Sequence, residues 1–166
     1  IDGVFNGDKN CDAIFISHYH ADHVGLLGNI LKKIPIYMGE KAFRILQASA
    51  NYRDKELGFD TNFIYDRQPV MIGDMSVTPY LCDHSAFDSY MFLIKHDGKT
   101  IIYTGDFRAN GRLDFDKLLY NLPEVDAVIV EGTTLSREDY KSNIEEQHLE
   151  QIATDHMKNH NGPAFF

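Results

Sequence analysis

The 166-residue sequence predicts either an α+β fold or a layered α/β/β/α arrangement. Its start is rich in strand-like segments, helical and strand-like connections then alternate, and many predicted strands end in loops. This pattern is typical of sheets that bury one face and are covered by helices. The order of the elements alone does not choose between the two arrangements.

The first part of the chain alternates between strand and helix signals. Residues 11–17, CDAIFIS, form a short β-rich apolar run, and residues 24–33 show the apolar spacing of a helix that stops before Pro35. Residues 34–38, IPIYM, then predict a strand, and residues 40–54 predict an amphipathic helix.

Strand-like segments dominate from residue 62 to residue 105. The Asp-Gly pair of HDGK, residues 96–99, predicts a hairpin between the last two of them. Beyond this region we expect a short helix, a buried strand and a final helix that starts with a capping box of Ser142 and Glu145. The predicted segments are the strands 62–65, 68–73, 75–82, 89–94 and 100–105, the helix 115–122 and the strand 125–132.

The composition is that of an ordinary globular protein, with 43% hydrophobic and 25% charged residues. A net charge of −9 argues against a broad basic surface for nucleic acid, and two cysteines exclude a disulfide framework. There is neither an apolar run of about 20 residues nor a secretory leader, so we expect a soluble, cytoplasmic protein with no membrane partner. The lack of an initiator Met and the apolar final residues suggest a segment of a longer protein.

The stretch SHYHADH, residues 17–23, carries the strongest chemical signal. It places His18, His20, Asp22 and His23 directly after a predicted strand. Side chains two apart in an extended segment point to the same side, so His18 and His20 can address one point, and Asp22 with His23 a second. Imidazole and carboxylate are the usual ligands of zinc and related ions. The alternative is that these residues only satisfy a polar loop.

Two distant residues also follow predicted strands. His84 lies in CDHS and Asp106 lies in YTGDF, where Gly105 permits a close backbone approach. Strand ends at one edge of a sandwich can meet the histidine cluster. We therefore predict one metal site of His18, His20 and His84 and a second of Asp22 and His23, with Asp106 bridging the two.

These motifs resemble the metallo-β-lactamase superfamily. HYHADH matches its HxHxDH signature, and His84 and the TGD of residues 104–106 match its next two metal motifs in order. The resemblance covers residues 11–132 and implies an αββα sandwich with one or two Zn²⁺ ions at a strand edge, with Mn²⁺ as an alternative ion. It also implies that the opening strands precede residue 1 and that a final ligand histidine follows residue 166.

The segment VIVEGTTLSR, residues 128–137, resembles the start of the β-CASP nucleases, which include ribonuclease J, pre-mRNA cleavage endonucleases and DNA cross-link repair nucleases. The resemblance implies that Glu131 supports a metal-bound histidine, although an acid that solvates a strand end is the simpler alternative. It divides the chain into a metallo-β-lactamase-type domain, residues 1–137, and residues 138–166, a helix and the start of a strand that lead into a β-CASP region.

Several other polar residues are weaker candidates. Arg108, Arg112 and Arg137 follow Asp106 and Glu131, and their guanidinium groups suit phosphate oxygens, although solvated loop arginines are the usual alternative. His156 and His160 have the i,i+4 spacing of a helical zinc pair, but without a third ligand we interpret them as a solvated helix face.

The first functional hypothesis is a zinc-dependent phosphodiesterase that cleaves RNA through a hydroxide activated by two metal ions, with Asp22 and His23 as the catalytic pair. Asp22 would ligate a metal ion and orient the hydroxide. A second hypothesis keeps the metal site but changes the substrate to a small ester, thioester or lactam, or makes the protein a DNA exonuclease of the same fold. A third is a metal-free scaffold paralogue. A homodimer is a further possibility for the longer parent protein.

Overall fold

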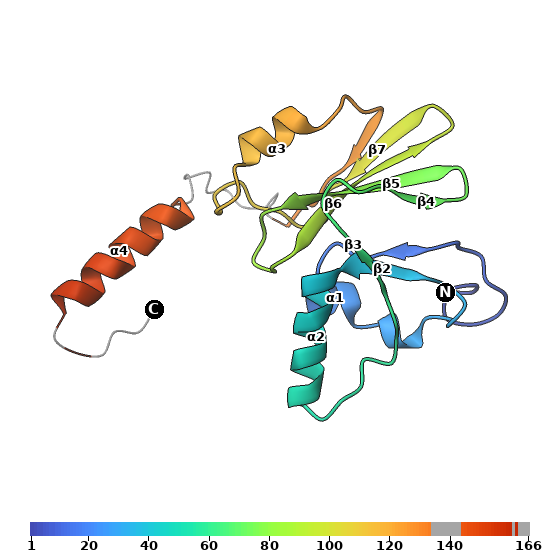
Figure 1. The fold of residues 1–166 in the computed structure, drawn as a ribbon, viewed down its shortest axis with the longest axis horizontal. Helices are drawn as coiled ribbons and strands as arrows, with labels where there is room; N and C mark the ends of the chain where they lie inside the picture. The colour runs from blue at the N-terminus through green and yellow to red at the C-terminus, as the bar shows by residue number, and fades with distance from the viewer. Residues whose placement is uncertain (134–143, 161, 163–166) are drawn as a thin grey trace.

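Two β-sheets lie face to face in the computed structural model, which describes residues 1–133, 144–160 and 162 (Figure 1). The first sheet has the order β1-β2-β3 and is parallel throughout. The second has the order β4-β5-β6-β7-β8 and is antiparallel except for the parallel pair β7 and β8. The strands are β1 (Ile14–Phe15), β2 (Ile36–Gly39), β3 (Asn62–Ile64), β4 (Val70–Ile72), β5 (Met75–Cys82), β6 (Ser89–His96), β7 (Lys99–Tyr103) and β8 (Ala127–Ile129).

Helices cover the outer faces of the two sheets. Helix α2 (Glu40–Tyr52) lies outside the three-stranded sheet, and α3 (Phe115–Asn121) lies beside the five-stranded sheet (Figure 1). The layers therefore follow the order α/β/β/α, which is the layered alternative that the sequence left open. Helix α4 (Glu146–Asn159) extends away from these layers.

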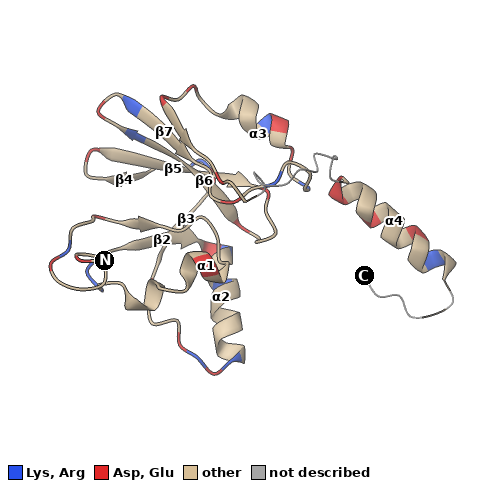
Figure 2. Ribbon diagram, turned by 180° about the vertical axis from the view of Figure 1, so that it is seen from behind, with Lys and Arg blue, Asp and Glu red and all other residues tan. Residues whose placement is uncertain are grey.

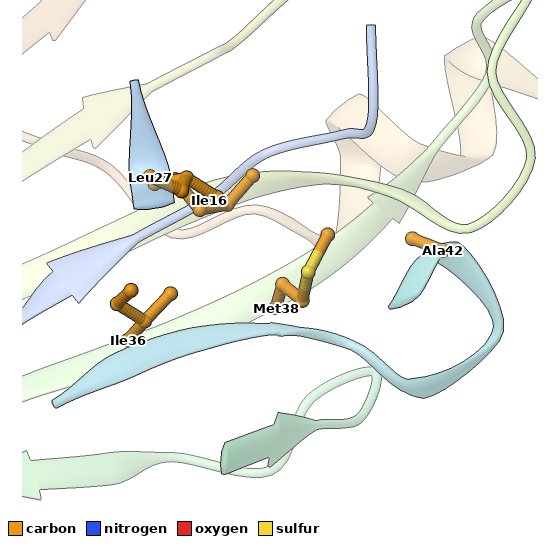
Figure 3. Packing of buried hydrophobic residues seen from close by; sticks show 5 residues of the cluster. All are labelled: Ile16, Leu27, Ile36, Met38 and Ala42. Carbon is orange, nitrogen blue, oxygen red and sulfur yellow. The ribbon is translucent and has the colours of Figure 1, made fainter. Parts of the chain in front are cut away.

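Each sheet face has its own apolar contacts. Ile36 and Met38 of β2 and Ile16, which follows β1, pack with Leu27 and with Ala42 of α2 (Figure 3). On the other face of the same sheet, the Phe15 ring stacks on Tyr37 and meets the edge of Phe92 from β6. The period-two alternation of strand side chains explains this division, because neighbouring residues of one strand serve the two different layers.

The predicted hairpin and most predicted elements are confirmed. Asp97 and Gly98 have φ values of 46° and 69°, as a two-residue turn between β6 and β7 requires. The strands predicted between residues 62 and 105 correspond to β3–β7, and the helices predicted at 40–54 and 115–122 correspond to α2 and α3. The strands predicted at 11–17 and 34–38 correspond to β1 and β2.

Two sequence predictions are wrong. Residues 24–33 do not form one helix: α1 (Ala21–Val24) ends at the first of these residues, and a 3-10 turn (Leu27–Asn29) follows. Gly25 and Gly28 weaken a helix at this point because glycine loses more backbone entropy than other residues. The strand predicted at 125–132 forms as β8, but all of its residues are exposed because it is the edge of its sheet.

The C-terminal part follows the prediction only in outline. Helix α4 begins at Glu146 with Glu145 at the N-cap, where Glu145 makes no side-chain capping hydrogen bond. The predicted cap residue Ser142, the proposed domain boundary at 137–138 and the final strand lie outside the described residues. Among the described residues, no helix is long and apolar enough to cross a membrane.

Candidate metal centre

The candidate site lies where three strands end. Strand β1 leads into residues 17–23, β5 leads into Asp83 and His84, and β7 leads into Gly105 and Asp106. The N–H of Tyr90, at the start of β6, donates to the carbonyl of Ser17 and so joins the residues after β1 to the five-stranded sheet. The five-stranded sheet and the parallel sheet therefore deliver polar side chains to one common edge.

Three imidazoles form the first group of candidate ligands. One nitrogen from each of His18, His20 and His84 lies within 4.8 Å of the others. Nδ1 of His20 and Nε2 of His84 are 3.2 Å apart. Two nitrogens of a tetrahedral zinc site are separated by about 3.3 Å when each Zn–N bond is about 2.0 Å. The structure thus brings together the three residues that the sequence analysis assigned to one ion, at a spacing that fits a metal.

A second group consists of His18, His23 and Asp106. Oδ2 of Asp106 lies 3.5 Å from Nε2 of His23, 3.8 Å from Nε2 of His18 and 3.9 Å from Nε2 of His84. The Asp106 carboxylate therefore faces both groups, where the sequence analysis placed a bridging residue. Asp22 Oδ2 lies 3.6 Å from Nε2 of His23, and its side chain is 78% exposed.

His18 lies at the centre of both groups and is fully buried. Its Nδ1 pairs with the hydroxyl of Ser17 at 3.1 Å, whereas Nε2 is a buried nitrogen without a hydrogen-bond partner among the described residues and has Asp106 Oδ2 3.8 Å away. Burial, reinforced by the neighbouring imidazoles of His23, His84 and His20, lowers the pKa of His18 to about 3. A neutral ring with one orphaned nitrogen is the form that binds a divalent cation, so this residue set fits a metal.

The other imidazole with a clear shift behaves in the same way. Burial first, and then the ring of His20, lowers the pKa of His84 below its ordinary value, although the Asp106 carboxylate opposes this. The protein environment therefore favours the neutral, ligating form of His84 as well. Histidines that only solvated a loop would be exposed, and these two are buried or half-buried.

Comparison with known proteins places this geometry in a family. Residues 6–161 match the Beta-lactamase superfamily domain. The chain belongs to this superfamily. The resemblance seen in the HxHxDH motif is thus confirmed at the superfamily level, and so is the αββα sandwich that it implied.

Curated relatives of this superfamily chain include three nucleic-acid enzymes or repair proteins. The DNA cross-link repair protein SNM1 of Arabidopsis thaliana is 28% identical over 116 residues, which are 68% of this chain and 22% of that protein. Ribonuclease J 2 of Streptococcus pyogenes is 26% identical over 65% of this chain and 20% of its own length. Ribonuclease Z of Sulfolobus acidocaldarius is 28% identical over 76% of this chain and 45% of its own length. The chain thus spans about a fifth of the first two and under half of the third.

Solved structures agree on the fold. A protein of unknown function from Enterococcus faecalis V583 matches 93% of this chain and 40% of its own, with a TM-score of 0.74 and 22% identity. The metallo-beta-lactamase fold protein YhfI from Bacillus subtilis matches 70% of this chain and 48% of its own, with a TM-score of 0.50 and 20% identity.

Gly105 sets the position of Asp106, the next residue along the chain. Its φ is +54°, and a Cβ placed there would lie 2.7 Å from the Cβ of Ser17. Glycine is therefore needed both for the backbone conformation and for the close approach to the strand end that carries His18. This is the close approach that the TGD motif predicted.

Glu131 supports the same loop from β8. Its Oε1 accepts the N–H of Phe107, the residue after Asp106, and its own N–H donates to the hydroxyl of Thr104. Burial would raise the pKa of Glu131, but the hydrogen bonds from Phe107 and Thr133 hold the pKa below its usual range. Among the described residues, no hydrogen bond joins Glu131 to an imidazole, so its visible contact is with the backbone beside Asp106.

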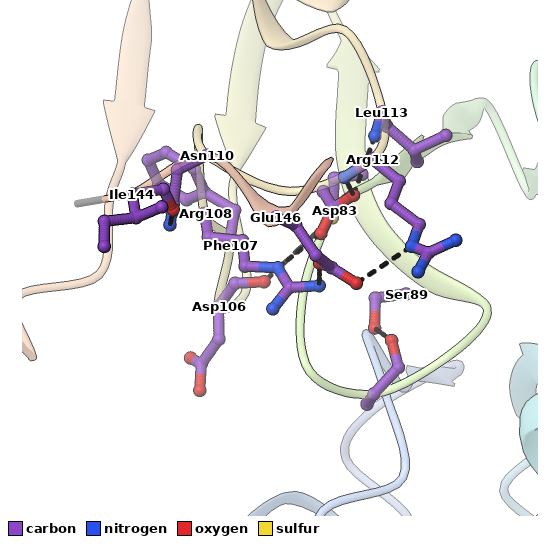
Figure 4. A network of polar contacts seen from close by, with 12 residues as sticks. Asp83, Ser89, Asp106, Phe107, Arg108, Asn110, Arg112, Leu113, Ile144 and Glu146 are labelled. Carbon is purple, nitrogen blue, oxygen red and sulfur yellow. Dashed lines mark hydrogen bonds and ion pairs between the residues drawn. The ribbon is translucent and has the colours of Figure 1, made fainter. Parts of the chain in front are cut away.

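Sequence reasoning did not single out Asp83, which organises the loop after Asp106. Its buried carboxylate accepts hydrogen bonds from Nε of Arg108 and from the N–H groups of Arg112 and Leu113 (Figure 4). Burial would raise the pKa of Asp83, but Arg108 and these N–H groups outweigh it and hold the pKa low. The only sequence signal was its place beside His84.

The two described arginines of the predicted phosphate set are engaged with carboxylates. Arg108 reaches Asp83 and Glu146, and Arg112 reaches Glu146 (Figure 4). Arg112 also pairs with Glu150, one turn further along α4. These ion pairs join α4 to the metal-site loop. Arg137 lies outside the described residues, and the phosphate role of all three remains a prediction.

Asp88 was also missed. Its Oδ2 accepts the N–H groups of Lys41 and Ala42 at 2.8 and 3.0 Å, and its Oδ1 accepts the hydroxyl of Tyr90 at 2.7 Å. Asp88, in the loop between β5 and β6, therefore caps the N-terminus of α2. The N-cap residue of α2 itself is Gly39, which has no side chain to do so. The φ of 65° at Asp88 is unusual for a residue other than glycine, and no local sequence pattern revealed this contact.

The His156 and His160 pair lies on and just beyond α4, with ring centroids 4.7 Å apart. The two groups of three ligand-type residues found in the described part of the chain both include His18, and neither includes this pair.

Charged residues elsewhere are interspersed along the loops and helices (Figure 2).

Proposed function

We propose that this protein is a metal-dependent phosphodiesterase of the β-CASP branch that cleaves nucleic acid, with RNA as the preferred substrate. The observation that supports this most is the Asp106 carboxylate, whose Oδ2 lies within 4 Å of three imidazoles from two other strand ends. A carboxylate shared between two imidazole groups is an arrangement that can hold a pair of divalent cations side by side.

The proposed ligand assignment follows from His18. Its Nδ1 is engaged with Ser17, so only Nε2 is available, and one nitrogen binds one ion. We assign His18 to the ion of His20 and His84, which leaves Asp22 and His23 for the second ion, with Asp106 between them. Imidazole and carboxylate donors suit Zn²⁺, with Mn²⁺ as the alternative. When bound, the two ions would acidify a water molecule and neutralise charge on the phosphoryl oxygens.

The protein groups around this centre have distinct proposed roles. Asp22 is the exposed carboxylate of the set, so its Oδ2 is open to solvent, where it would orient the attacking water and accept its proton. Glu131 and Gly105 would hold the Asp106 loop in place, and Ser17 would keep His18 in the tautomer that presents a bare Nε2.

The substrate class is supported by the relatives and by the charge of the chain. Ribonuclease J 2, Ribonuclease Z and SNM1 carry names that refer to RNA or DNA. A chain with 25 acidic and 16 basic residues lacks a large excess of cations for an anionic polymer. Bound divalent cations would supply the local positive charge that a phosphodiester needs.

The proposal is tested with purified protein on three substrates: 5′-labelled single-stranded RNA, DNA of the same sequence and a chromogenic ester. We expect cleavage of RNA that EDTA abolishes and that added Zn²⁺ or Mn²⁺ restores, with up to two ions per chain by elemental analysis. His84→Ala should lose bound metal, and Asp22→Asn should lose activity on the order of 100-fold or more.

The matched control is His96→Ala. His96 is an exposed histidine at the end of β6, where it pairs with Asp74 of the β4–β5 turn. This variant should retain wild-type activity and metal content. Ester turnover with intact RNA and DNA would end the nuclease proposal. Protein that binds no metal would instead favour the scaffold alternative.

A further inference from the structure

An exposed aromatic ring lies beside the candidate metal centre. Phe87 follows His84 by three residues in the loop between β5 and β6, and its side chain is 61% exposed although Ala86 and Asp88 on either side are buried. Phe87, His84 and Arg108 line one cleft of about 310 Å³. The ring is therefore accessible from the same cleft as a candidate metal ligand.

The backbone around this ring is held by several contacts. The N–H of Phe87 donates to the hydroxyl of Tyr19 at 3.2 Å, and the hydroxyl of Ser89 donates to the carbonyl of Ala86 at 2.7 Å. Asp88 accepts two N–H groups from the first turn of α2. An exposed ring on a restrained backbone loses little entropy when a flat partner packs on it.

Charge and position favour an anionic, flat partner. The ammonium group of Lys41 lies over the Phe87 ring, 5.4 Å from its centroid. Tyr19, which accepts the Phe87 N–H, has its own ring 5.8 Å from that of His20. The ring thus lies next to an exposed cation and lines the same cleft as His84, so a ligand stacked on Phe87 would have its anionic part within reach of Lys41.

The geometry points to Phe87 as a stacking platform for one base of a single-stranded nucleic acid, with Lys41 contacting an adjacent phosphate. This inference rests on the proposed function and adds to it a preference for an unpaired strand. Bases of a single strand can unstack and lie on an aromatic side chain, whereas those of a duplex are already stacked on their neighbours.

The test measures binding without catalysis. Full-length protein in EDTA is titrated into a fluorescently labelled 12-nucleotide single-stranded RNA and into an abasic strand with the same sugar-phosphate backbone, and Kd is read from anisotropy. The wild type should bind the base-bearing strand about 10-fold more tightly than the abasic one, because stacking on an aromatic ring contributes in this range.

Variants distinguish the contribution of the flat Phe87 ring to binding from that of its apolar volume and from that of the Lys41 charge. Phe87→Ala and Phe87→Leu should both lose the preference for bases, since leucine keeps the volume but not the flat face, and Phe87→Trp should keep it. Lys41→Gln should weaken binding of both strands equally and lower the slope of log Kd against log salt by about 0.7. Tyr52→Ala removes an even more exposed aromatic ring at the far end of α2 and should change neither the base preference nor the salt dependence.

Equal wild-type affinity for the base-bearing and abasic strands would overturn the inference, as would a full base preference in folded Phe87→Leu. Affinity for duplex RNA that matches the single-stranded value would also contradict it. The cleavage assay distinguishes the two proposals. A base preference that depends on Phe87, without cleavage, leaves the platform and removes the phosphodiesterase. RNA cleavage without a base preference supports the phosphodiesterase and removes the stacking platform.

Discussion

Replacement of Asp88 by alanine should destabilise the protein by about 3 kcal/mol. This carboxylate joins three donors: the N–H groups of Lys41 and Ala42 in the first turn of α2, and the hydroxyl of buried Tyr90. Loss of a helix cap costs about 1 kcal/mol. A buried hydroxyl left without its partner costs about 1–3 kcal/mol more. Alanine also tolerates the φ of 65° poorly.

Urea unfolding followed by circular dichroism gives the free energy of unfolding for each variant. Asp88→Asn keeps an oxygen for the α2 N–H groups and an amide for Tyr90, so it should cost about 1 kcal/mol, a typical net value for a hydrogen bond. In a Tyr90→Phe background, the penalty of Asp88→Ala should fall because no hydroxyl is left unpaired. A loss below about 1 kcal/mol for Asp88→Ala would refute this account of the cap. An unchanged penalty in the Tyr90→Phe background would refute the Tyr90 contribution.

Three further predictions concern the metal-site loops. The pKa of His18 is lowered from 6.5 to about 3, so the unfolded chain binds one more proton than the folded chain between these pH values. Metal-free protein should therefore lose about 1.4 kcal/mol of stability per pH unit as the pH falls through this window. Urea unfolding at several pH values should give a shallower slope of stability against pH for His18→Gln, and an identical slope would contradict the assignment. Asp83→Ala should cost about 2–3 kcal/mol and speed hydrogen exchange at residues 108–113, since it leaves three donors without their acceptor; unchanged exchange there would show that the loop does not depend on Asp83. Gly105→Ala should lower metal content by elemental analysis, whereas Gly98→Ala, which has a similar positive φ but no atom within 4 Å of an added Cβ, should retain it; equal metal content in both would mean that the contact with Ser17 is unimportant.

Local signals in the sequence were sufficient for most of the fold. The hairpin at Asp97 and Gly98 could be predicted because a two-residue turn needs positive φ at both positions, which Asp-Gly supplies. Helix α2 could be predicted over residues 40–54 from its amphipathic apolar spacing, and it forms over Glu40–Tyr52. Both features depend on residues that are close along the chain.

The errors arose where a local pattern was overridden by its surroundings. The apolar spacing at 24–33 resembles a helix, but Gly25 and Gly28 interrupt it and the chain forms α1 and a 3-10 turn. The apolar residues of β8 resemble a buried strand, yet Val128 and Ile129 are more than half exposed at the edge of the sheet. Burial depends on what packs against a strand, and the strand's own sequence does not contain that information.

The candidate ligands were predictable for a different reason from the residues that position them. His18, His20, Asp22 and His23 are neighbours in sequence, and His84 and Asp106 each follow a strand, so residue type and strand ends were sufficient. Apart from Tyr90, which is two residues from Asp88, the donors to Asp83 and Asp88 lie 25 to 47 residues away, and such contacts leave no periodic trace.

The segment from Asp83 to Asp88 explains why these long-range contacts matter for the site. At one end Asp83 binds the loop that follows Asp106, and at the other end Asp88 binds the first turn of α2. Between these two anchors lie His84, which faces the other imidazoles, and Phe87, which faces solvent. A metal-ligating side chain on a short loop is held in position only when both ends of the loop are fixed. An unrestrained loop would lose backbone entropy each time a metal ion bound. Two buried carboxylates outside both candidate ligand groups therefore prepare the geometry on which the candidate metal site and the proposed stacking platform depend.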